Sequence, residues 1–594
     1  MKFPYGLADF YKIRKEGYFY QDRTHFIRTV EERGSQLIFL RPRRFGKSMW
    51  LSTLTNYYDV ARTHEFAMLF GDLAIGQNPT PLHNQYLILR WDFSKVAAFG
   101  EVETVIQALY DHINDRIEDF RKRYAEHLLH PISIHAANAI SSFESLLSAI
   151  DGQPYKLYLL IDEYDNFTNE IAMSGTHSDA ERYLAMSTGD GLLKTVFKNV
   201  KAAMGEGRLD RVFVTGVSPM LLSDLTSGFN TATDISLERQ MHNLCGFTEP
   251  EVVQLTQQVS HQCALAPEQI AEMSELMRVF YNGYTFLPDV QGALYNPTLV
   301  LYFLGKVQLE GQPPQKLLDV NLAMDKNKLA YIASRPGGEE TILRLMEDDP
   351  PLAVREIYDR FSLTDLVQPV QESEHLASLL FYFGLASIPG RTNTGKLRLQ
   401  IPNLVTHGLY FEQLRALLLP DVLRRNQARE VVELLCTEGQ MQPLCDFMAE
   451  RVYRSFSNRD YRHANELTVK ALFLSLLYND LLYVTDSEPE LERRYADLLM
   501  LLRPTQRIYQ LFDLLIEFKY LELSEVHLNA EGVRGKTDAE LVALEKVKIE
   551  FTAARSALKA YRQTLATKYG DLLKLRVYAI VSLGFERVLW QEVS

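Results

Sequence analysis

Short apolar runs alternate with helical stretches between about residue 36 and residue 217. The apolar runs have the length and character of buried strands, and they cover residues 36–40, 86–91, 156–161 and 211–215. Strands that alternate with helices form a mostly parallel sheet with helices on both of its faces. The pattern therefore predicts an α/β domain in the first part of the chain.

A helical pattern replaces this alternation from Phe247 to about Arg335. Residues 376–402 are then predicted to form an apolar helix and two strands, which are joined by a polar turn at residues 392–395. A helix followed by a hairpin is typical of a winged helix. We therefore expect a helical, winged-helix-like lid after the α/β domain.

The last part of the chain predicts a second α/β domain. A helical connector near residues 414–429 leads into further helices, and two adjacent strands follow at residues 495–502 and 508–521. Another helical stretch separates these strands from a late strand at residues 577–583. The expected division is therefore residues 1–245, 246–420 and 421–594.

The composition is that of a globular protein, with 46% hydrophobic and 23% charged residues among 594. The start of the chain, residues 1–10, lacks the basic-then-apolar pattern of a signal peptide. The most apolar stretch, residues 471–484, is too short to span a bilayer and is interrupted by Asn479 and Asp480. We therefore expect no membrane segment.

The charge and the cysteines narrow the expected setting further. The net charge of −13 argues against a broad basic surface for nucleic acid, although a local basic groove remains compatible with it. The four cysteines have neither metal-ligand spacing nor the density of a disulfide framework, and they are Cys245, Cys263, Cys436 and Cys445. A reduced, cytoplasmic setting fits this pattern.

The segment from Arg41 to Ser48 reads Arg-Pro-Arg-Arg-Phe-Gly-Lys-Ser and lies between an expected strand and an expected helix. This is the context of a Walker A phosphate loop, in which Gly46 and the helix N-terminus cradle phosphates. Lys47 would reach the β- and γ-phosphate oxygens, and Ser48 would ligate Mg²⁺. The simpler alternative is an ordinary helix N-terminus, because Arg41 replaces the first glycine and disfavours a positive φ there.

A second motif supports the phosphate-loop interpretation. Residues 158–163 read Tyr-Leu-Leu-Ile-Asp-Glu, an apolar strand that ends in two acids, as a Walker B strand does. Asp162 would hold Mg²⁺ through water, and Glu163 would polarise the attacking water. Thr215 ends the next predicted strand, where it would either sense the γ-phosphate or cap the following turn.

The remaining residues of the phosphate loop are also assigned to the nucleotide. Arg43, Arg44 and Phe45 lie in the loop itself, and the two arginines would contact nucleotide phosphates or a neighbouring subunit. They could equally be solvated basic residues. The expected cofactors of this site are ATP and Mg²⁺.

Several strings together resemble the bacterial and archaeal AAA-ATPase-like proteins: Gly17-Tyr-Phe-Tyr-Gln-Asp-Arg-Thr24, Arg41 to Ser48, Leu160-Ile-Asp-Glu-Tyr-Asp165, Tyr295-Asn-Pro297 and Ile401-Pro-Asn403. The resemblance implies that Arg41 is a family trait. It also implies a P-loop NTPase fold and a C-terminal restriction-endonuclease-like domain of the PD-(D/E)xK type, because such proteins often end in one. Asp22 and Thr24 would either border the nucleotide or cap a helix over residues 23–33.

Four residues of the last domain form a candidate nuclease site. Glu517 and Lys519 share one face of a predicted strand, because side chains on a strand alternate. An antiparallel neighbour can place Asp497 beside Glu517, and the preceding helix supplies Glu466. The three carboxylates would hold a divalent cation that activates water, while Lys519 would orient that water or stabilise charge on phosphorus.

Two observations argue against an intact metal site at these residues. Relatives usually carry a glutamine in the next helix, where Ala560 stands here, although Gln563 lies one turn further on. Glu517 and Lys519 could also simply pair across a solvated strand.

The leading hypothesis is an ATP-regulated, metal-dependent nuclease that acts on DNA and could assemble as a homo-oligomer, in a role such as defence against foreign DNA. The alternative is a nucleotide switch whose C-terminal domain binds nucleic acid or protein without cutting. A DNA-remodelling motor fits less well, because we find no helicase motif series.

Overall fold

The structure is a computed structural model, and it describes residues 1–96, 101–166, 192–219, 231–317, 325–346, 351–359, 361, 373–455, 465–486, 490–491, 494–495 and 497–593. The chain forms two compact units. The first unit comprises residues 1–314, 318–341 and 351–403, and the second comprises residues 315–317, 342–350 and 404–594.

A parallel sheet of five strands forms the centre of the first unit, in the order β2-β3-β4-β1-β5. Its strands are β1 (Gln36–Leu40), β2 (Tyr86–Asp92), β3 (Lys156–Asp162), β4 (Arg211–Gly216) and β5 (Thr233–Asp234). The four apolar runs that predicted strands are thus confirmed to within one residue. The pattern did not reveal β5, because two exposed residues carry no apolar signal.

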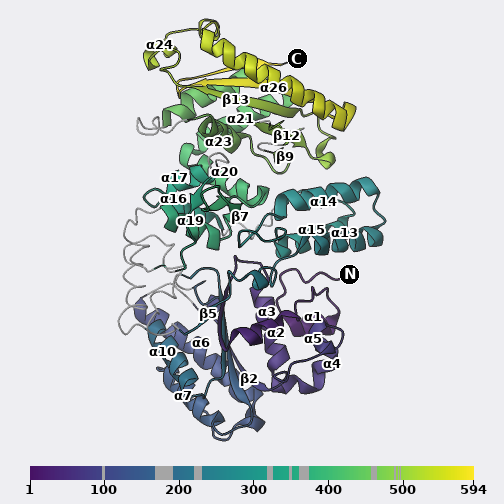
Figure 1. The fold of residues 1–594 in the computed structure, drawn as a ribbon, viewed down its shortest axis with the longest axis vertical. Coiled ribbons are helices and arrows are strands. Elements are labelled where there is room, and N and C mark those ends of the chain that lie inside the picture. Colours follow the sequence, from purple (N-terminus) through teal and green to yellow (C-terminus); the bar gives the residue numbers. More distant parts are fainter. Residues whose placement is uncertain are drawn as a thin grey trace. The chain divides into compact units, whose positions relative to one another are not determined.

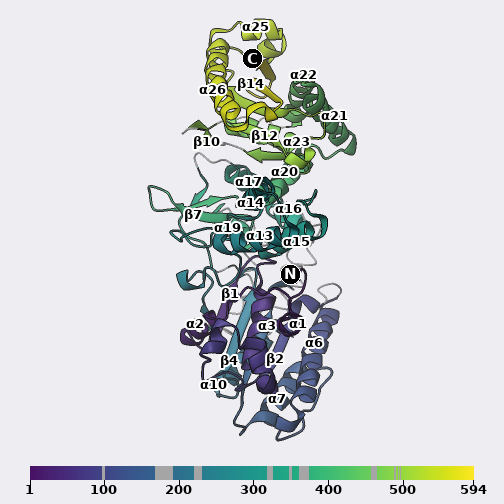
Figure 2. The same cartoon turned by 90° about the vertical axis from the view of Figure 1, so that its right-hand side faces the viewer.

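Helices cover both faces of this sheet, as the alternation predicted (Figures 1 and 2). Helix α3 lies on one face with the short N-terminal helices, and α6, α7 and α10 lie on the other. These helices are α1 (Phe10–Glu16), α2 (Phe26–Arg33), α3 (Lys47–Tyr58), α4 (Phe66–Phe70), α5 (Ala74–Gln77), α6 (Val102–Arg123), α7 (Ala139–Ile150) and α10 (Leu192–Gly205).

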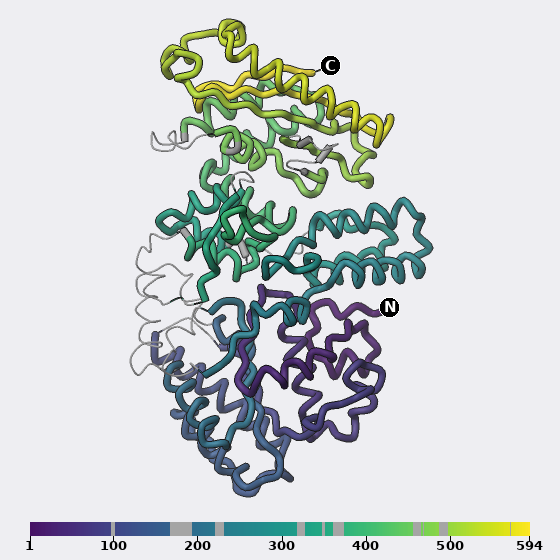
Figure 3. Tube along the Cα trace, viewed as in Figure 1, coloured from purple at the N-terminus to yellow at the C-terminus, as the bar shows by residue number. Residues whose placement is uncertain are grey.

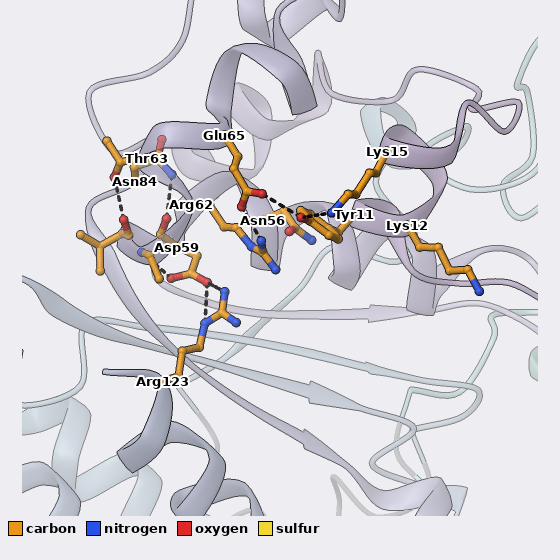
Figure 4. Close-up of polar contacts among 12 residues, drawn as sticks. Tyr11, Lys12, Lys15, Asn56, Asp59, Arg62, Thr63, Glu65, Asn84 and Arg123 are labelled. Carbon is orange, nitrogen blue, oxygen red and sulfur yellow. Dashed lines mark hydrogen bonds and ion pairs between the residues drawn. The ribbon is translucent and has the colours of Figure 1, made fainter. Parts of the chain in front are cut away.

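The C-terminal end of α3 is fixed by a buried carboxylate, that of Asp59 (Figure 4). Its Oδ1 accepts hydrogen bonds from the hydroxyl of Tyr124 at 2.8 Å and from the amide of Ala61 at 2.9 Å. Its Oδ2 accepts from Nε of Arg123, which ends α6, at 2.9 Å. Because Asp59 ties α3 to a helix on the opposite face of the sheet, the helix that begins at the phosphate loop has a fixed position.

A second set of contacts in the same view, around Tyr11, holds the short helices together. The Tyr11 hydroxyl donates to Glu65 at 2.7 Å, and the guanidinium of Arg62 lies 3.9 Å from the centre of the Tyr11 ring (Figure 4). These contacts pack α1 against the segment that follows α3.

The first unit continues into helices and a three-stranded antiparallel sheet in the order β6-β8-β7. The predicted helix and hairpin are present as α19, β7 and β8. The elements are α13 (Glu249–Cys263), α14 (Pro267–Tyr281), α15 (Pro297–Glu310), α16 (Asp325–Ala333), α17 (Gly338–Leu345), β6 (Ala353–Val354), α19 (Ser373–Tyr382), β7 (Ser387–Arg391) and β8 (Leu397–Gln400). The N-terminal segment lies beside α13 and α15, where Tyr5 packs on Tyr302 with ring centres 5.8 Å apart (Figure 3).

The second unit contains a sheet in the order β15-β14-β13-β12-β9, in which β13 and β14 are parallel and the other neighbours are antiparallel. Its strands are β9 (Tyr483–Asp486), β12 (Leu498–Leu502), β13 (Asp513–Leu521), β14 (Leu575–Leu583) and β15 (Arg587–Glu592). Its longer helices are α20 (Leu404–Leu418), α21 (Val422–Glu438), α23 (Glu466–Leu477) and α26 (Glu545–Tyr569). The described part thus shows the second α/β arrangement that the pattern predicted.

Each face of this second sheet has its own hydrophobic core. Leu514, Ile516 and Phe518 pack with the helices around α23, and the rings of Phe473 and Phe518 lie 5.1 Å apart. Leu515 and Leu521 face the other way and pack against α26. The alternation along β13 therefore determines which side chains lie on the α26 face, including those of the candidate site.

Several predicted boundaries differ from the structure. The strand expected over residues 495–502 begins at Leu498, so Asp497 precedes it, and the strand expected from residue 577 begins at Leu575. The strand expected from residue 508 begins at Asp513, because residues 504–506 form a 3₁₀ turn and the buried Asp513 carboxylate accepts from the amide of Leu502 at 2.8 Å. The expected connector is two helices, α20 and α21, with Pro420 between them. The helix expected from Arg23 begins at Phe26. No helix within the described ranges is both long and apolar enough to cross a membrane.

Candidate nucleotide site and C-terminal carboxylate site

The phosphate loop lies between β1 and α3, as the sequence predicted. Its turns are made at Arg44, with φ of 67°, and at Gly46, with φ of 101°. The backbone φ of Arg41, by contrast, is not positive. Replacement of the first glycine therefore causes no strain, because the left-handed residues lie further along the loop.

Lys47 is buried inside this loop. Its Nζ donates to the carbonyl oxygen of Arg41 at 3.0 Å and to that of Pro42 at 3.1 Å. The ammonium therefore lies in the concavity of the loop, with the backbone amides at the start of α3 nearby. That is the position from which a lysine reaches bound phosphates.

Arg41 has a structural role and points away from the loop. Its buried guanidinium donates to the carbonyl oxygens of Ser236 at 2.7 Å and Met241 at 3.1 Å. It lies 4.2 Å from the centre of the Phe286 ring, and burial lowers its pKa to about 10. Arg41 thus ties the loop to the segment after β5, and it is not available to a phosphate.

Asp162 and Thr215 are brought together at the ends of neighbouring strands β3 and β4. The Thr215 hydroxyl donates to Oδ1 of Asp162 at 2.8 Å, and both side chains are buried. Oδ2 of Asp162 accepts from the guanidinium of Arg90 on β2 at 3.1 Å. The sequence analysis placed Asp162 and Thr215 at strand ends without predicting that they pair, and it gave no signal for Arg90.

Glu163 follows Asp162 in a left-handed conformation, with φ of 49°. Such a conformation is uncommon for a residue with a side chain and often marks a functional position. Burial raises the pKa of Glu163, while the positive charge of Lys47 partly offsets the effect. The carboxylate lines the same cavity as Lys47 and Ser48.

The backbone after Glu163 is held by Asp165. Its carboxylate accepts from the amides of Val217 at 3.0 Å and Ser218 at 2.7 Å, just beyond β4. A Cβ at Gly216 would lie 2.4 Å from the Tyr164 ring, so a glycine is needed for this close approach. The strained turn at Glu163 is therefore fixed by the neighbouring strand.

The other loop residues have different surroundings. Arg43 donates to the side-chain oxygen of Asn166. The backbone N–H of Asn166 in turn donates to the carbonyl oxygen of Glu163 at 3.0 Å. Arg44 lines the cavity. Phe45 is buried against Tyr284, with ring centres 4.8 Å apart, and it also lines the cavity.

The cavity has a volume of about 370 Å³. One end is polar and contains Gly46, Lys47, Ser48 and Glu163, and the remainder is largely apolar. Its apolar wall includes side chains that the sequence analysis did not assign, namely Leu7, Phe19, Leu244, Phe247, Pro297 and Leu301. They come from the N-terminal segment, from the segment before α13 and from α15, and only Phe19 and Pro297 lie in the strings that the sequence analysis singled out.

Asp22 and Thr24 do not line this cavity, whereas Gln21 and Arg23 do. The Asp22 carboxylate accepts from the amide of Thr24 at 2.8 Å and from the amide of Ala74 at 2.7 Å. Helix α2 begins later, and neither residue caps it. Both therefore satisfy the N-terminus of α5, which neither of the two predicted roles anticipated.

The second candidate site lies in the second unit, on the α26 face of its sheet. Strands β12 and β13 are antiparallel with Leu498 opposite Ile516, and Asp497 lies directly before β12. Leu499 and Leu515 face α26, and alternation along β13 places Glu517 on that face too. Asp497 and Glu517 therefore lie near each other at the same end of the two strands.

Lys519 connects the acids of this site. Its Nζ lies 3.1 Å from Oε1 of Glu466 and 3.4 Å from Oε1 of Glu517. Asp497 accepts from the backbone amide of Phe518 at 2.7 Å through Oδ2. All four residues predicted for this site are thus neighbours.

The electrostatics follow from this crowding. Burial, and then the charge of Asp497, raise the pKa of Glu517 to about 7. Burial and Asp497 also raise the pKa of Glu466. The pKa of Lys519 is raised by the three acids although its own burial opposes this. Oε2 of Glu517 is buried without a hydrogen-bond partner among the described residues.

In the described ranges, no three or more His, Cys, Asp or Glu side chains are grouped so as to hold a metal ion. Lys519, which neutralises Glu466 and Glu517, lies where such a grouping was expected. Gln563 is exposed on α26 and Ala560 is half-buried, so neither supplies the missing amide.

Comparison with known proteins identifies part of the chain. Residues 4–226 match a family described as "Predicted AAA-ATPase". An Azotobacter chroococcum mcd 1 protein, described as an uncharacterized protein in the vnfD 5′ region, is 28% identical over 310 residues. The match spans 51% of this chain and 52% of that relative, so it covers about half of the relative's length.

Two solved structures match the chain at low identity and with low TM-scores. A Walker-type ATPase of Pyrococcus abyssi is 14% identical with a TM-score of 0.38, over 66% of this chain and 95% of that one. The Aeropyrum pernix Orc1 protein, solved in complex with DNA, is 10% identical with a TM-score of 0.26, over 67% and 94%. Neither likeness is close enough to transfer a function. Residues 4–226 are thus similar to this predicted ATPase family, and they contain four strands of the parallel sheet.

Proposed function

We propose that this chain binds and hydrolyses ATP, and that its nucleotide domain regulates a metal-dependent DNA nuclease in the C-terminal unit. The observation that carries the first part is the cavity of the first unit, where Lys47, Ser48 and Glu163 line one polar end. Asp162 and Thr215 lie at the adjoining strand ends, hydrogen-bonded to each other. The match to the AAA-ATPase family supports the same activity.

Different residues of this cavity would bind different parts of the nucleotide and its metal ion. The amides at the start of α3 and the ammonium of Lys47 would hold the phosphates, while the apolar wall would receive the base. Ser48 and Asp162 fit Mg²⁺, because a hydroxyl and a buried carboxylate are oxygen ligands at the mouth of the phosphate loop. When bound, Mg²⁺ would neutralise charge on the phosphates.

Glu163 is the proposed general base for hydrolysis. Its raised pKa makes it a better proton acceptor than an ordinary carboxylate, and its fixed left-handed backbone aims it into the cavity. It would orient the attacking water and accept its proton.

Glu163→Gln should therefore bind ATP like the parent protein but hydrolyse it at least about 100-fold more slowly. Binding of a fluorescent ATP analogue and release of phosphate, measured on the same preparation, separate the two effects. Glu206→Gln, at an exposed position of the same unit, is the matched control and should change neither. Hydrolysis at the parent rate in Glu163→Gln would exclude this residue as the base.

The second part of the proposal rests on the carboxylate site of the second unit. Glu517 has a buried oxygen without a hydrogen-bond partner among the described residues, and a cation would satisfy it. Asp497 and Glu517 would hold the divalent cation, with Glu466 nearby, and such an ion supplies an activated water at neutral pH. Lys519, which lies 3.1 Å from Glu466 and 3.4 Å from Glu517, would stabilise charge on phosphorus.

The experiment that tests the whole proposal uses plasmid, linear and single-stranded DNA with Mg²⁺ or Mn²⁺, in the presence and absence of ATP. Cleavage that needs the metal and changes with ATP supports the coupled nuclease. ATP hydrolysis with no cleavage of any substrate would contradict the nuclease and favour the alternative, a switch whose C-terminal unit binds without cutting. Lys519, which lies between Glu466 and Glu517, is the observation that favours that alternative.

The domain division and the setting complete the proposal. We propose residues 1–245 as the ATPase domain, 246–420 as the lid and 421–594 as the nuclease-like domain, with the correction that α20, residues 404–418, belongs to the second unit. All four cysteines are free, which fits a reducing, cytoplasmic environment. DNA is the proposed partner, in a role such as defence against foreign DNA, and a homo-oligomer is compatible with this architecture.

A further inference from the structure

Arg90 is a charged residue in the nucleotide site that none of the sequence motifs includes. It lies on β2, whose strand pairs in register with β3, so that Arg90 is opposite Leu160 and Asp92 is opposite Asp162. Because side chains alternate along a strand, Arg90 and Asp92 point to the same face of the sheet as Asp162. Two acids and one guanidinium therefore share the end of this strand pair.

The two oxygens of the Asp162 carboxylate have different partners. Oδ1 accepts from the hydroxyl of Thr215, a residue that is completely buried. Oδ2 accepts from Arg90, whose side chain is 33% exposed, whereas that of Asp162 is 3% exposed. Arg90 is thus the partner that can leave.

The neighbouring acid, Asp92, has hydrogen-bond and ion-pair partners other than Arg90. The Asp92 carboxylate accepts from the amide and the hydroxyl of Ser94, at 3.2 and 2.6 Å, and lies 3.3 Å from Nζ of Lys95. Asp92 is therefore satisfied within its own turn. The specific contact of Arg90 is with Asp162.

We propose that Arg90 is a positioning residue that holds Asp162 before nucleotide binds and must yield the carboxylate to the divalent cation of the nucleotide complex. This rests on the proposed ATP site. A guanidinium and a divalent cation near one carboxylate oxygen repel each other, so binding of the metal competes with the ion pair. Arg90 would then set how much Mg²⁺ the protein needs to bind ATP tightly.

The test is a Mg²⁺ titration of the full chain with a fluorescent ATP analogue, starting from EDTA. Arg90→Met keeps an apolar stem but removes the charge, and it should lower the Mg²⁺ concentration for half-saturation by about threefold to tenfold. Binding in EDTA should stay unchanged. Arg90→Lys retains a positive charge and should remain near the parent protein, and it also serves if Arg90→Met folds poorly.

Lys95→Met is the matched control, because it removes a positive charge from the same strand end but from Asp92 instead of Asp162. It should leave the half-saturation within about twofold of the parent value. An equal shift in both variants would reduce the effect to general electrostatics and overturn the proposal. No shift in Arg90→Met, or a higher Mg²⁺ requirement, would overturn it as well.

The failure of this inference can be distinguished from failure of the ATP site itself. If the parent protein binds the analogue neither in EDTA nor in Mg²⁺, the proposed ATP site is wrong and the inference falls with it. If the parent protein binds with a clear Mg²⁺ dependence and the Arg90 variants follow it, only the role of Arg90 is wrong.

Discussion

Lys47→Ala is expected to bind ATP at least about 100-fold more weakly than the parent protein. The ammonium is buried in the phosphate loop, where it donates to the carbonyls of Arg41 and Pro42. Its removal leaves the phosphate charge without its buried cation and also removes two bonds that shape the empty loop. Binding is measured with a fluorescent ATP analogue, and the shift of thermal unfolding by ATP gives a second readout.

Lys12→Ala is the control for this prediction, since Lys12 is an exposed lysine on α1 of the same unit that points away from the contacts around Tyr11 (Figure 4). The control should bind ATP normally. If Lys47→Ala also binds and hydrolyses ATP at the parent level, the phosphate-loop interpretation is wrong and the cavity must bind something else.

Asp497→Asn and Glu517→Gln should each reduce DNA cleavage by at least about a thousandfold while ATP hydrolysis continues. Both variants keep the shape of the side chain and remove the charge that would hold a divalent cation. The two sites are built from separate units, so the loss should be confined to cleavage. A gel assay of DNA cleavage and a phosphate-release assay measure the two activities in parallel.

Glu545→Gln is the matched control, because Glu545 is an exposed acid at the start of α26 in the same unit. It should cleave normally. Cleavage at the parent rate in Asp497→Asn would contradict the metal site. Loss of ATP hydrolysis in either variant would contradict independent sites and indicate a folding defect or a tight coupling.

The same site predicts a dependence on pH. The pKa of Glu517 is raised to about 7 by burial and by Asp497, so below that pH the carboxylate is largely protonated and competes poorly for a cation. Metal affinity should therefore rise as the pH increases from 6 towards 8, and binding near pH 7 should release a proton. Calorimetry in buffers of different ionisation enthalpy measures that proton directly.

Much of the fold could be predicted, because the signals were local. The four apolar runs of the first sheet were strands to within one residue, since a buried parallel strand is apolar along its whole length. The polar turn at residues 392–395 predicted the hairpin of β7 and β8. Strand alternation predicted that Glu517 and Lys519 share one face of β13, whereas Asp497 lies just before β12 instead of within the expected strand.

The predictions failed where a hydrogen bond or a turn that the local sequence pattern does not show decides the structure. The start of β13, which ends at Leu521, was predicted five residues too early. The buried carboxylate of Asp513 and the turn at Pro504 define where this strand begins. Asp22 was expected either to border the nucleotide or to cap a helix that follows it directly, but its carboxylate accepts from the amide of Ala74 in a helix 52 residues away along the chain.

By itself, the sequence determined the order of strands and helices, the phosphate loop with Lys47, and the acid pair at the end of β3, because these depend on neighbours within one turn or one strand. Only the tertiary structure decided the roles that depend on distant partners. Arg41 is buried against the segment after β5, Arg90 holds Asp162, and Lys519 lies between Glu466 and Glu517. A charged side chain takes its role from the groups that folding places around it, and the sequence pattern near it carries no record of them.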